Sequence, residues 1–206
     1  MGFRRKARGI GLLGAAAFAA LNLFAAPADG QGGGELHPAV VFSFDTPASA
    51  GIWPSIAQAF AREALDPRQN YPLPADTELL PAFALHPGSE FGRAIQVHLL
   101  GRCDVAEQAF RPLGPGPLGW VRSVSGEIQP FVYVDCARLA QFLDAKVLGM
   151  DDEQRVAAMS TAIARITIHE WLHITLQSAA HTDHGIRRAE LTPDDLVQLA
   201  PSSAGN

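Results

Sequence analysis

The sequence HEWLH at residues 169–173 lies inside one long helical pattern, and the two together constrain the fold more than any other feature. Residues 151–177 repeat apolar side chains at every third or fourth position, which is the period of an α-helix face. His169 and His173 are four residues apart, so on a helix both imidazoles can bind one Zn²⁺. Glu170 lies near the same face, where a carboxylate can take a proton from a water that the ion activates.

The helix face also predicts that these polar residues are buried. Glu170 and His173 continue an apolar stripe, and His169 borders it. The stripe consists of Val156, Met159, Ile163 and Ile166. Buried imidazoles and a buried carboxylate cost free energy unless something pairs with them, and a divalent cation would do so. The competing interpretation is a set of polar residues satisfied within the protein, without an ion.

A zinc site needs a third protein ligand, and we expect it to be His181. The helix must then end near Gln177 and the chain must turn back. In a continuous helix, residue 181 would lie about 12 Å from His173 along the helix axis, too far to share a metal ion with it. The residues HTDHG at 181–185 are typical of a turn-rich loop. The alternative third ligands are His184, Asp183 and Glu190.

The first 28 residues have the pattern of a secretory signal peptide. Four basic residues precede an Ala-rich apolar stretch, and Ala26-Pro27-Ala28 offers a cleavage site. We expect a flexible, Gly-rich leader over residues 29–37, a domain over 38–200 and a disordered tail over 201–206. The expected location is therefore secreted or periplasmic. The alternative, a membrane anchor, requires a longer apolar run than this stretch offers.

The net charge limits the classes of partner that the protein can bind, and the two cysteines indicate the compartment. The full chain carries −5, and removal of a segment with four basic residues and no acidic one leaves −9. An acidic chain has no electrostatic reason to bind nucleic acid. No second apolar stretch is long enough to cross a membrane after signal cleavage. Cys103 and Cys136 would form a disulfide in an oxidising compartment; the alternative is two buried free thiols.

The remaining chain mixes strand and helix patterns. We expect strands over 39–44 and 94–100, and a hairpin formed by 118–124 and 128–134, with Pro130 making the start of the last strand irregular. Helices are expected over 55–65, 138–148 and 192–200. Residues 66–92 are rich in Pro and show no clear period, so they are expected to be irregular.

Residues 163–195 resemble small secreted bacterial zincin-like metallopeptidases. Such proteins have an HExxH helix, a third His eight residues after the second, and a nearby Gly. The corresponding residues are His169, Glu170, His173, His181 and Gly185. The stretch 118–136 resembles the strand region that precedes this helix. The best-known metzincin pattern is not met, because Leu176 stands at its Gly position and no Met follows Gly185.

The resemblance implies a fold and an activity. The fold is one α+β domain, in which a small mixed β-sheet packs on the long HExxH helix. The activity is hydrolysis of peptide bonds, with Zn²⁺ held by His169, His173 and His181 and with Glu170 as the catalytic residue. The strand 118–124 could align an extended peptide substrate at the sheet edge. Arg187 and Arg188 are candidates for oxyanion stabilisation. The alternative function is a non-catalytic secreted zinc-binding or metal-sequestering module.

Overall fold

A mixed five-stranded β-sheet is the central element of the computed structural model, which describes residues 36–64, 74, 76–103 and 115–197. The predicted signal peptide, residues 29–35 of the predicted leader, and the tail lie outside the described residues. Together with five helices, the sheet makes one small domain, which confirms the α+β prediction.

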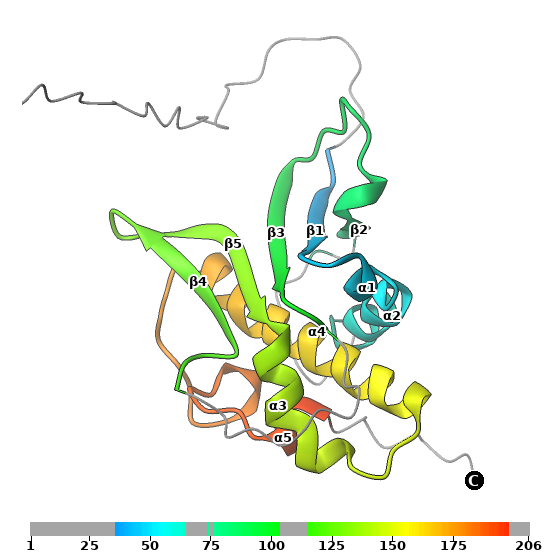
Figure 1. The fold of residues 1–206 in the computed structure, drawn as a ribbon. Coiled ribbons are helices and arrows are strands. Elements are labelled where there is room, and N and C mark those ends of the chain that lie inside the picture. Colours follow the sequence, from blue (N-terminus) through cyan, green and yellow to red (C-terminus); the bar gives the residue numbers. More distant parts are fainter. Residues whose placement is uncertain (1–35, 65–73, 75, 104–114, 198–206) are drawn as a thin grey trace, which may run out of the picture. The chain divides into compact units, whose positions relative to one another are not determined.

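The sheet is parallel except at one edge. Its strand order is β2-β1-β3-β5-β4, and only β4 runs antiparallel to its neighbour (Figure 1). The strands are β1 (Pro38–Phe44), β2 (Glu78–Pro81), β3 (Arg93–Leu100), β4 (Gly119–Val124) and β5 (Glu127–Asp135). The hairpin between β4 and β5 is as predicted. Ser125 and Gly126 form its turn with φ values of 53° and 86°, which suit the twist of paired strands.

One face of the sheet supplies the core. Val97 and Leu99 of β3 are fully buried, and they pair in register with Val132 and Val134 of β5, which are buried too. Because side chains alternate across a strand, these four residues share one face. They belong to the same apolar cluster as residues of the helices. The core therefore lies between this face and the helices.

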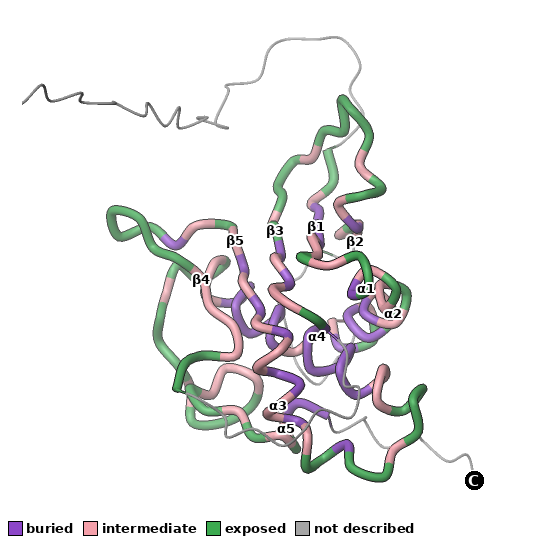
Figure 2. The backbone as a smooth tube through the Cα atoms, in the orientation of Figure 1, coloured by how far each residue is buried: buried purple, intermediate pink, exposed green. Residues whose placement is uncertain are grey.

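Helix α4 is the longest element and the one that carries the HEWLH sequence. The helices are α1 (Pro47–Ala50), α2 (Trp53–Ala64), α3 (Cys136–Val147), α4 (Asp152–Leu176) and α5 (Pro193–Val197), with 3₁₀ turns η1 (Ala82–Ala84) and η2 (Gly185–Arg187). The side chain of Asp151 caps α4 and, with Gln154, forms a capping box. Helix α4 contacts the other helices α2, α3 and α5 and the strands β4 and β5. Its middle part is buried almost continuously (Figure 2).

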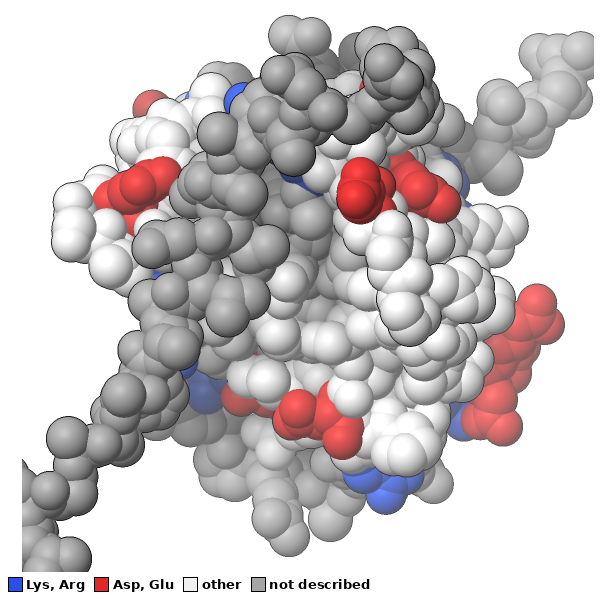
Figure 3. Space-filling model, turned by 90° about the horizontal axis from the view of Figure 1, so that it is seen from above, with Lys and Arg blue, Asp and Glu red and all other residues white. Residues whose placement is uncertain are grey.

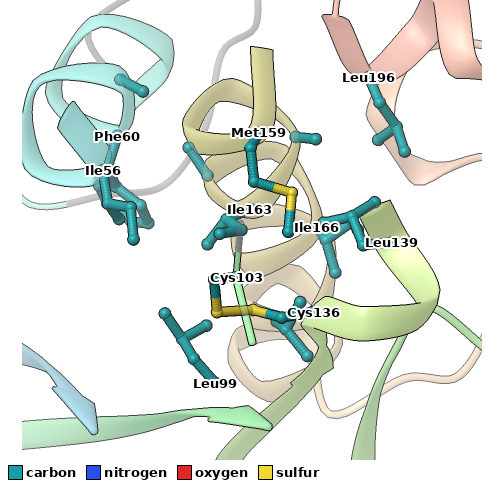
Figure 4. Close-up of a cluster of buried hydrophobic side chains, with 14 of the residues drawn as sticks. Ile56, Phe60, Leu99, Cys103, Cys136, Leu139, Met159, Ile163, Ile166 and Leu196 are labelled. Carbon is teal, nitrogen blue, oxygen red and sulfur yellow. A yellow bond between two sulfur atoms is a disulfide. The ribbon is translucent and has the colours of Figure 1, made fainter. Parts of the chain in front are cut away.

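A disulfide joins Cys103 to Cys136, as predicted. It connects the segment after β3 to the first residue of α3, and both cysteines are buried. Leu99 and Ile163 lie near the two sulfur atoms in the core (Figure 4). The bond thus fixes the end of the central parallel strand to the helical layer.

Two details of the sheet differ from the sequence prediction. Residues 78–81, inside the stretch expected to be irregular, form β2 and pair in parallel with β1. The strand is short and its partner is distant in sequence, so no local period marks it. The irregularity expected at the start of β5 lies further along. Glu127 and Ile128 are paired, and the register shifts between Val121 and Ser123 of β4, in the region opposite Pro130.

On the face that Figure 3 shows, the acidic side chains do not form one continuous patch. Asp and Glu side chains gather there in several separate groups, between areas of uncharged residues. Among the described residues, no helix combines the length and the apolar character that a membrane span requires.

Candidate metal centre

Three imidazoles converge at the end of α4. His169 and His173 come from the last two turns of the helix, and His181 comes from the loop that follows. One ring nitrogen of each lies within 4.8 Å of the others. The ring centroid of His181 is 5.3 Å from that of His169 and 4.9 Å from that of His173. The three histidines expected from the sequence to act together are therefore neighbours, and they could hold a metal ion.

Backbone carbonyls fix the tautomers of the two helical histidines. Nδ1 of His169 lies 2.6 Å from the carbonyl oxygen of Ile186, and Nδ1 of His173 lies 2.6 Å from that of Ser178. A carbonyl oxygen only accepts hydrogen bonds, so each Nδ1 carries the hydrogen and donates it. In the neutral rings, both Nε2 atoms are then left with a free lone pair, which is the form that binds metals.

The two Nε2 atoms are only 3.1 Å apart. Two lone pairs at this distance repel each other unless a cation lies between them. Zn–N bonds are about 2.0–2.1 Å long, so two nitrogens on one tetrahedral zinc ion lie about 3.3 Å apart. The observed spacing and the tautomers therefore fit a metal ion held by nitrogen ligands.

Burial favours the neutral form of two of the rings, those of His169 and His181. It lowers the pKa of His169 to about 4, with smaller contributions in the same direction from His173, His181 and Arg187 and an opposing one from the hydrogen bond to Ile186. The pKa of His181 is lowered as well, by burial first and then by the charges of His173 and Arg187. A proton therefore does not compete with a metal for His169 at neutral pH.

Glu170 lies beside one of the three histidines, His169. Its Oε1 is 4.0 Å from Nε2 of His169, and its side chain is 9% exposed. Removal from water raises the pKa of this carboxyl group to about 7. Within the described part of the chain, no residue donates a hydrogen bond to it, so little besides water or a cation can stabilise its charge.

Strand β4 packs closely on α4 at this carboxylate. A Cβ added at Gly119 would lie 2.3 Å from Cγ2 of Ile166 and 3.5 Å from Cγ of Glu170. Only a residue without a side chain lets the strand approach so closely. Gly119 thus places the edge strand directly against the helix turn that carries Glu170.

Gln177 makes the turn that brings His181 back, and the sequence reasoning missed its role. It adopts the left-handed conformation with φ 47° and ψ 42° at the end of α4. Its side chain accepts a hydrogen bond from the N–H of Ile128 on β5 (2.9 Å) and donates one to the carbonyl of the same residue (3.0 Å). The next residue, Ser178, provides the carbonyl for His173. Gln has no preference for this conformation, so no signal in the sequence indicates it.

The alternative third ligands do not join the group. The group that could hold a metal consists of His169, His173 and His181, and His184, Asp183 and Glu190 lie outside it. Exposure does not distinguish them, because His181 is exposed too. The loop is closed by a hydrogen bond from the N–H of Thr182 to the carbonyl of Arg187 (3.0 Å).

The two arginines that follow the loop differ in their contacts. Arg188 forms an ion pair with Asp195 of α5 at 3.2 Å. Arg187 is half-buried, and its Nη2 donates a long hydrogen bond of 3.4 Å to the carbonyl of Ala180. Of the two guanidinium groups, only that of Arg187 forms a hydrogen bond to the loop that contains His181.

Comparison with known proteins yields no match: no family model covers the chain, and neither a curated protein nor a solved structure is significantly similar to it.

Proposed function

We propose that this protein is a secreted or periplasmic zinc-dependent metallopeptidase of the zincin type. The observation that carries the proposal is the arrangement of three imidazoles around one point with a buried carboxylate 4.0 Å from one of the ligand nitrogens. Three protein ligands, which leave a fourth position free, are typical of catalytic rather than structural zinc sites. The disulfide supports an oxidising compartment.

His169, His173 and His181 would hold the ion through one ring nitrogen each. When bound, zinc supplies an activated water molecule and polarises the scissile carbonyl group. The carbonyls of Ile186 and Ser178 orient the rings of His169 and His173 and keep their Nε2 atoms free.

Glu170 would move the proton. A buried carboxylate with a pKa of about 7 accepts a proton from the attacking water and returns it to the leaving amine near neutral pH. The charge of the metal would lower this pKa by favouring the ionised form, which keeps the carboxylate in its base form at the start of the reaction.

Strand β4 would align the substrate. It is the outermost strand of the sheet on its side, so one of its edges has no strand partner among the described residues. An extended peptide can add to such an edge through backbone hydrogen bonds. Because Gly119 holds β4 against the turn of Glu170, a peptide on this edge would run past the metal centre.

The test is the substitution Glu170→Gln in the purified full-length protein. We expect one zinc ion per chain in both proteins, and peptide cleavage at least about 100-fold slower in the variant because the proton carrier is lost. Equal cleavage rates at equal zinc content would refute the assignment of Glu170. A zinc-loaded wild type that cleaves no member of a broad peptide panel would instead support the non-catalytic zinc-binding module.

A further inference from the structure

Arg187 presents a positive charge at the rim of the metal centre. Its backbone follows Ile186, the residue whose carbonyl binds His169, and its guanidinium reaches the carbonyl of Ala180, the residue before His181. The charge is close enough to act electrostatically on the rings of both His169 and His181. Both the backbone and the side chain of Arg187 therefore lie close to the segment that carries the candidate ligands.

This guanidinium has no carboxylate partner in the part of the chain that the structure describes. Its hydrogen bond to Ala180 is 3.4 Å long and uses one of five N–H donors. The neighbouring Arg188 differs, because two of its contacts, at 3.2 and 3.4 Å, go to the carboxylate of Asp195. Arg188 has a structural role in joining the loop to α5, whereas most donors of Arg187 stay available.

A cation in this position is unfavourable for metal binding as such. It repels a divalent ion and disfavours the approach of the ion to the three imidazoles. Its presence is explained if the site receives a negatively charged group. The planar fork of a guanidinium matches a carboxylate in two parallel hydrogen bonds.

We infer that Arg187 is a specificity-determining residue that binds a carboxylate of the substrate next to the metal centre. The substrate class is then an anionic peptide, whose carboxylate is either the C-terminus or an acidic side chain near the cleaved bond. The inference rests on the proposed peptidase function for its biological meaning. The binding of a carboxylate can be measured without any cleavage.

The experiment uses the zinc-loaded Glu170→Gln protein, which is expected to bind peptides and leave them intact. The probes are randomised N-acetylated tetrapeptides in two pools, one with a free C-terminal carboxylate and one with a C-terminal amide. Retention on the immobilised protein is measured by mass spectrometry. The same pools are applied after a second substitution, Arg187→Gln, and in a matched control after Arg188→Gln. Zinc content is measured in every variant.

We expect carboxylate-bearing peptides to be retained about 10- to 100-fold more strongly than neutral ones, as for a charge-assisted hydrogen bond. The preference should disappear with Arg187→Gln and persist with Arg188→Gln. Enrichment of the free-acid pool identifies the C-terminus as the bound group. Enrichment of Asp and Glu within the amide pool identifies an acidic side chain.

Zinc affinity separates this role from a structural one. Arg187→Gln should bind zinc at least as tightly as the parent protein, because a repelling charge is removed. Weaker zinc binding would show that Arg187 merely holds the loop, and equal retention of neutral and anionic peptides would overturn the inference. Both results are independent of catalysis, so a failure of the peptidase proposal shows up separately, as absence of cleavage by the wild type.

Discussion

The buried carboxylate of Glu170 predicts a stability difference that depends on pH and on metal. In the metal-free protein its pKa is raised from 4.5 to about 7, because the ionised form loses water and gains no partner. Between these two values the unfolded chain binds fewer protons than the folded one, so the free energy of unfolding falls as the pH rises. The substitution Glu170→Gln removes this titration and keeps the shape of the side chain.

The size of the effect follows from the shift in pKa. One pKa unit corresponds to about 1.4 kcal/mol, so full ionisation of Glu170 costs roughly 3 kcal/mol in the folded metal-free protein. Most of that cost arises between pH 5 and pH 8. Relative to wild type, the variant should therefore gain about 2–3 kcal/mol of unfolding free energy over this interval.

The assay is urea unfolding of both proteins at pH 5 and pH 8 in the presence of a chelator, with the disulfide intact. The lowered pKa of His169 acts in the opposite direction, but it is present in both proteins and cancels in the difference. Addition of zinc should abolish most of the variant's advantage at pH 8, because the cation stabilises the carboxylate. A difference between the proteins that stays the same at both pH values would refute the argument that burial dominates the ionisation of Glu170.

Three further predictions concern the residues around the centre. His181→Ala should weaken zinc binding more than about 100-fold, as measured by competition with a chelator, whereas His184→Ala should leave it unchanged; the opposite result would exchange their roles. Gly119→Ala should lower the unfolding free energy by about 1–3 kcal/mol in thermal or urea unfolding, because the new methyl group collides with Ile166, and an unchanged stability would show that β4 can move away. Gln177→Ala should be less stable than Gln177→Gly by about 1 kcal/mol in the same unfolding assay. Both variants lose the hydrogen bonds to β5, but only Gly adopts the left-handed conformation without strain. Equal stabilities would argue against strain at this turn.

Local periodicity and spacing were sufficient to predict most elements of the fold. The alternation of residues 94–100 and the period of residues 151–177 predicted the strand β3 and the helix α4 close to their observed limits. The period indicated one buried face of α4, whereas residues 158–172 are buried almost all round the helix. The disulfide was predicted from two cysteines and an expected compartment. Strand β2 and the order of the strands were not predictable in this way, because they depend on pairing between distant segments.

The candidate centre was predictable where the chemistry is local and unpredictable where it depends on tertiary contacts. The spacing of His169 and His173 follows from helix geometry, and the return of His181 followed from the need for a third ligand. The chain turns back at Gln177, whose side chain is hydrogen-bonded to the backbone of β5. Neither composition nor periodicity indicates this contact. The carbonyls that orient the rings belong to residues whose side chains are irrelevant to that task.

All three candidate ligands, and the carbonyls that orient two of them, lie in one uninterrupted stretch from residue 169 to residue 186. Insertions, deletions or exchanges elsewhere in the chain leave the spacing of this stretch unchanged. The strand that borders Glu170 comes from a separate part of the chain. Sequence changes in β4 can therefore alter the surface that borders Glu170 during evolution. The histidines that supply the ring nitrogens stay together in one short segment of the chain.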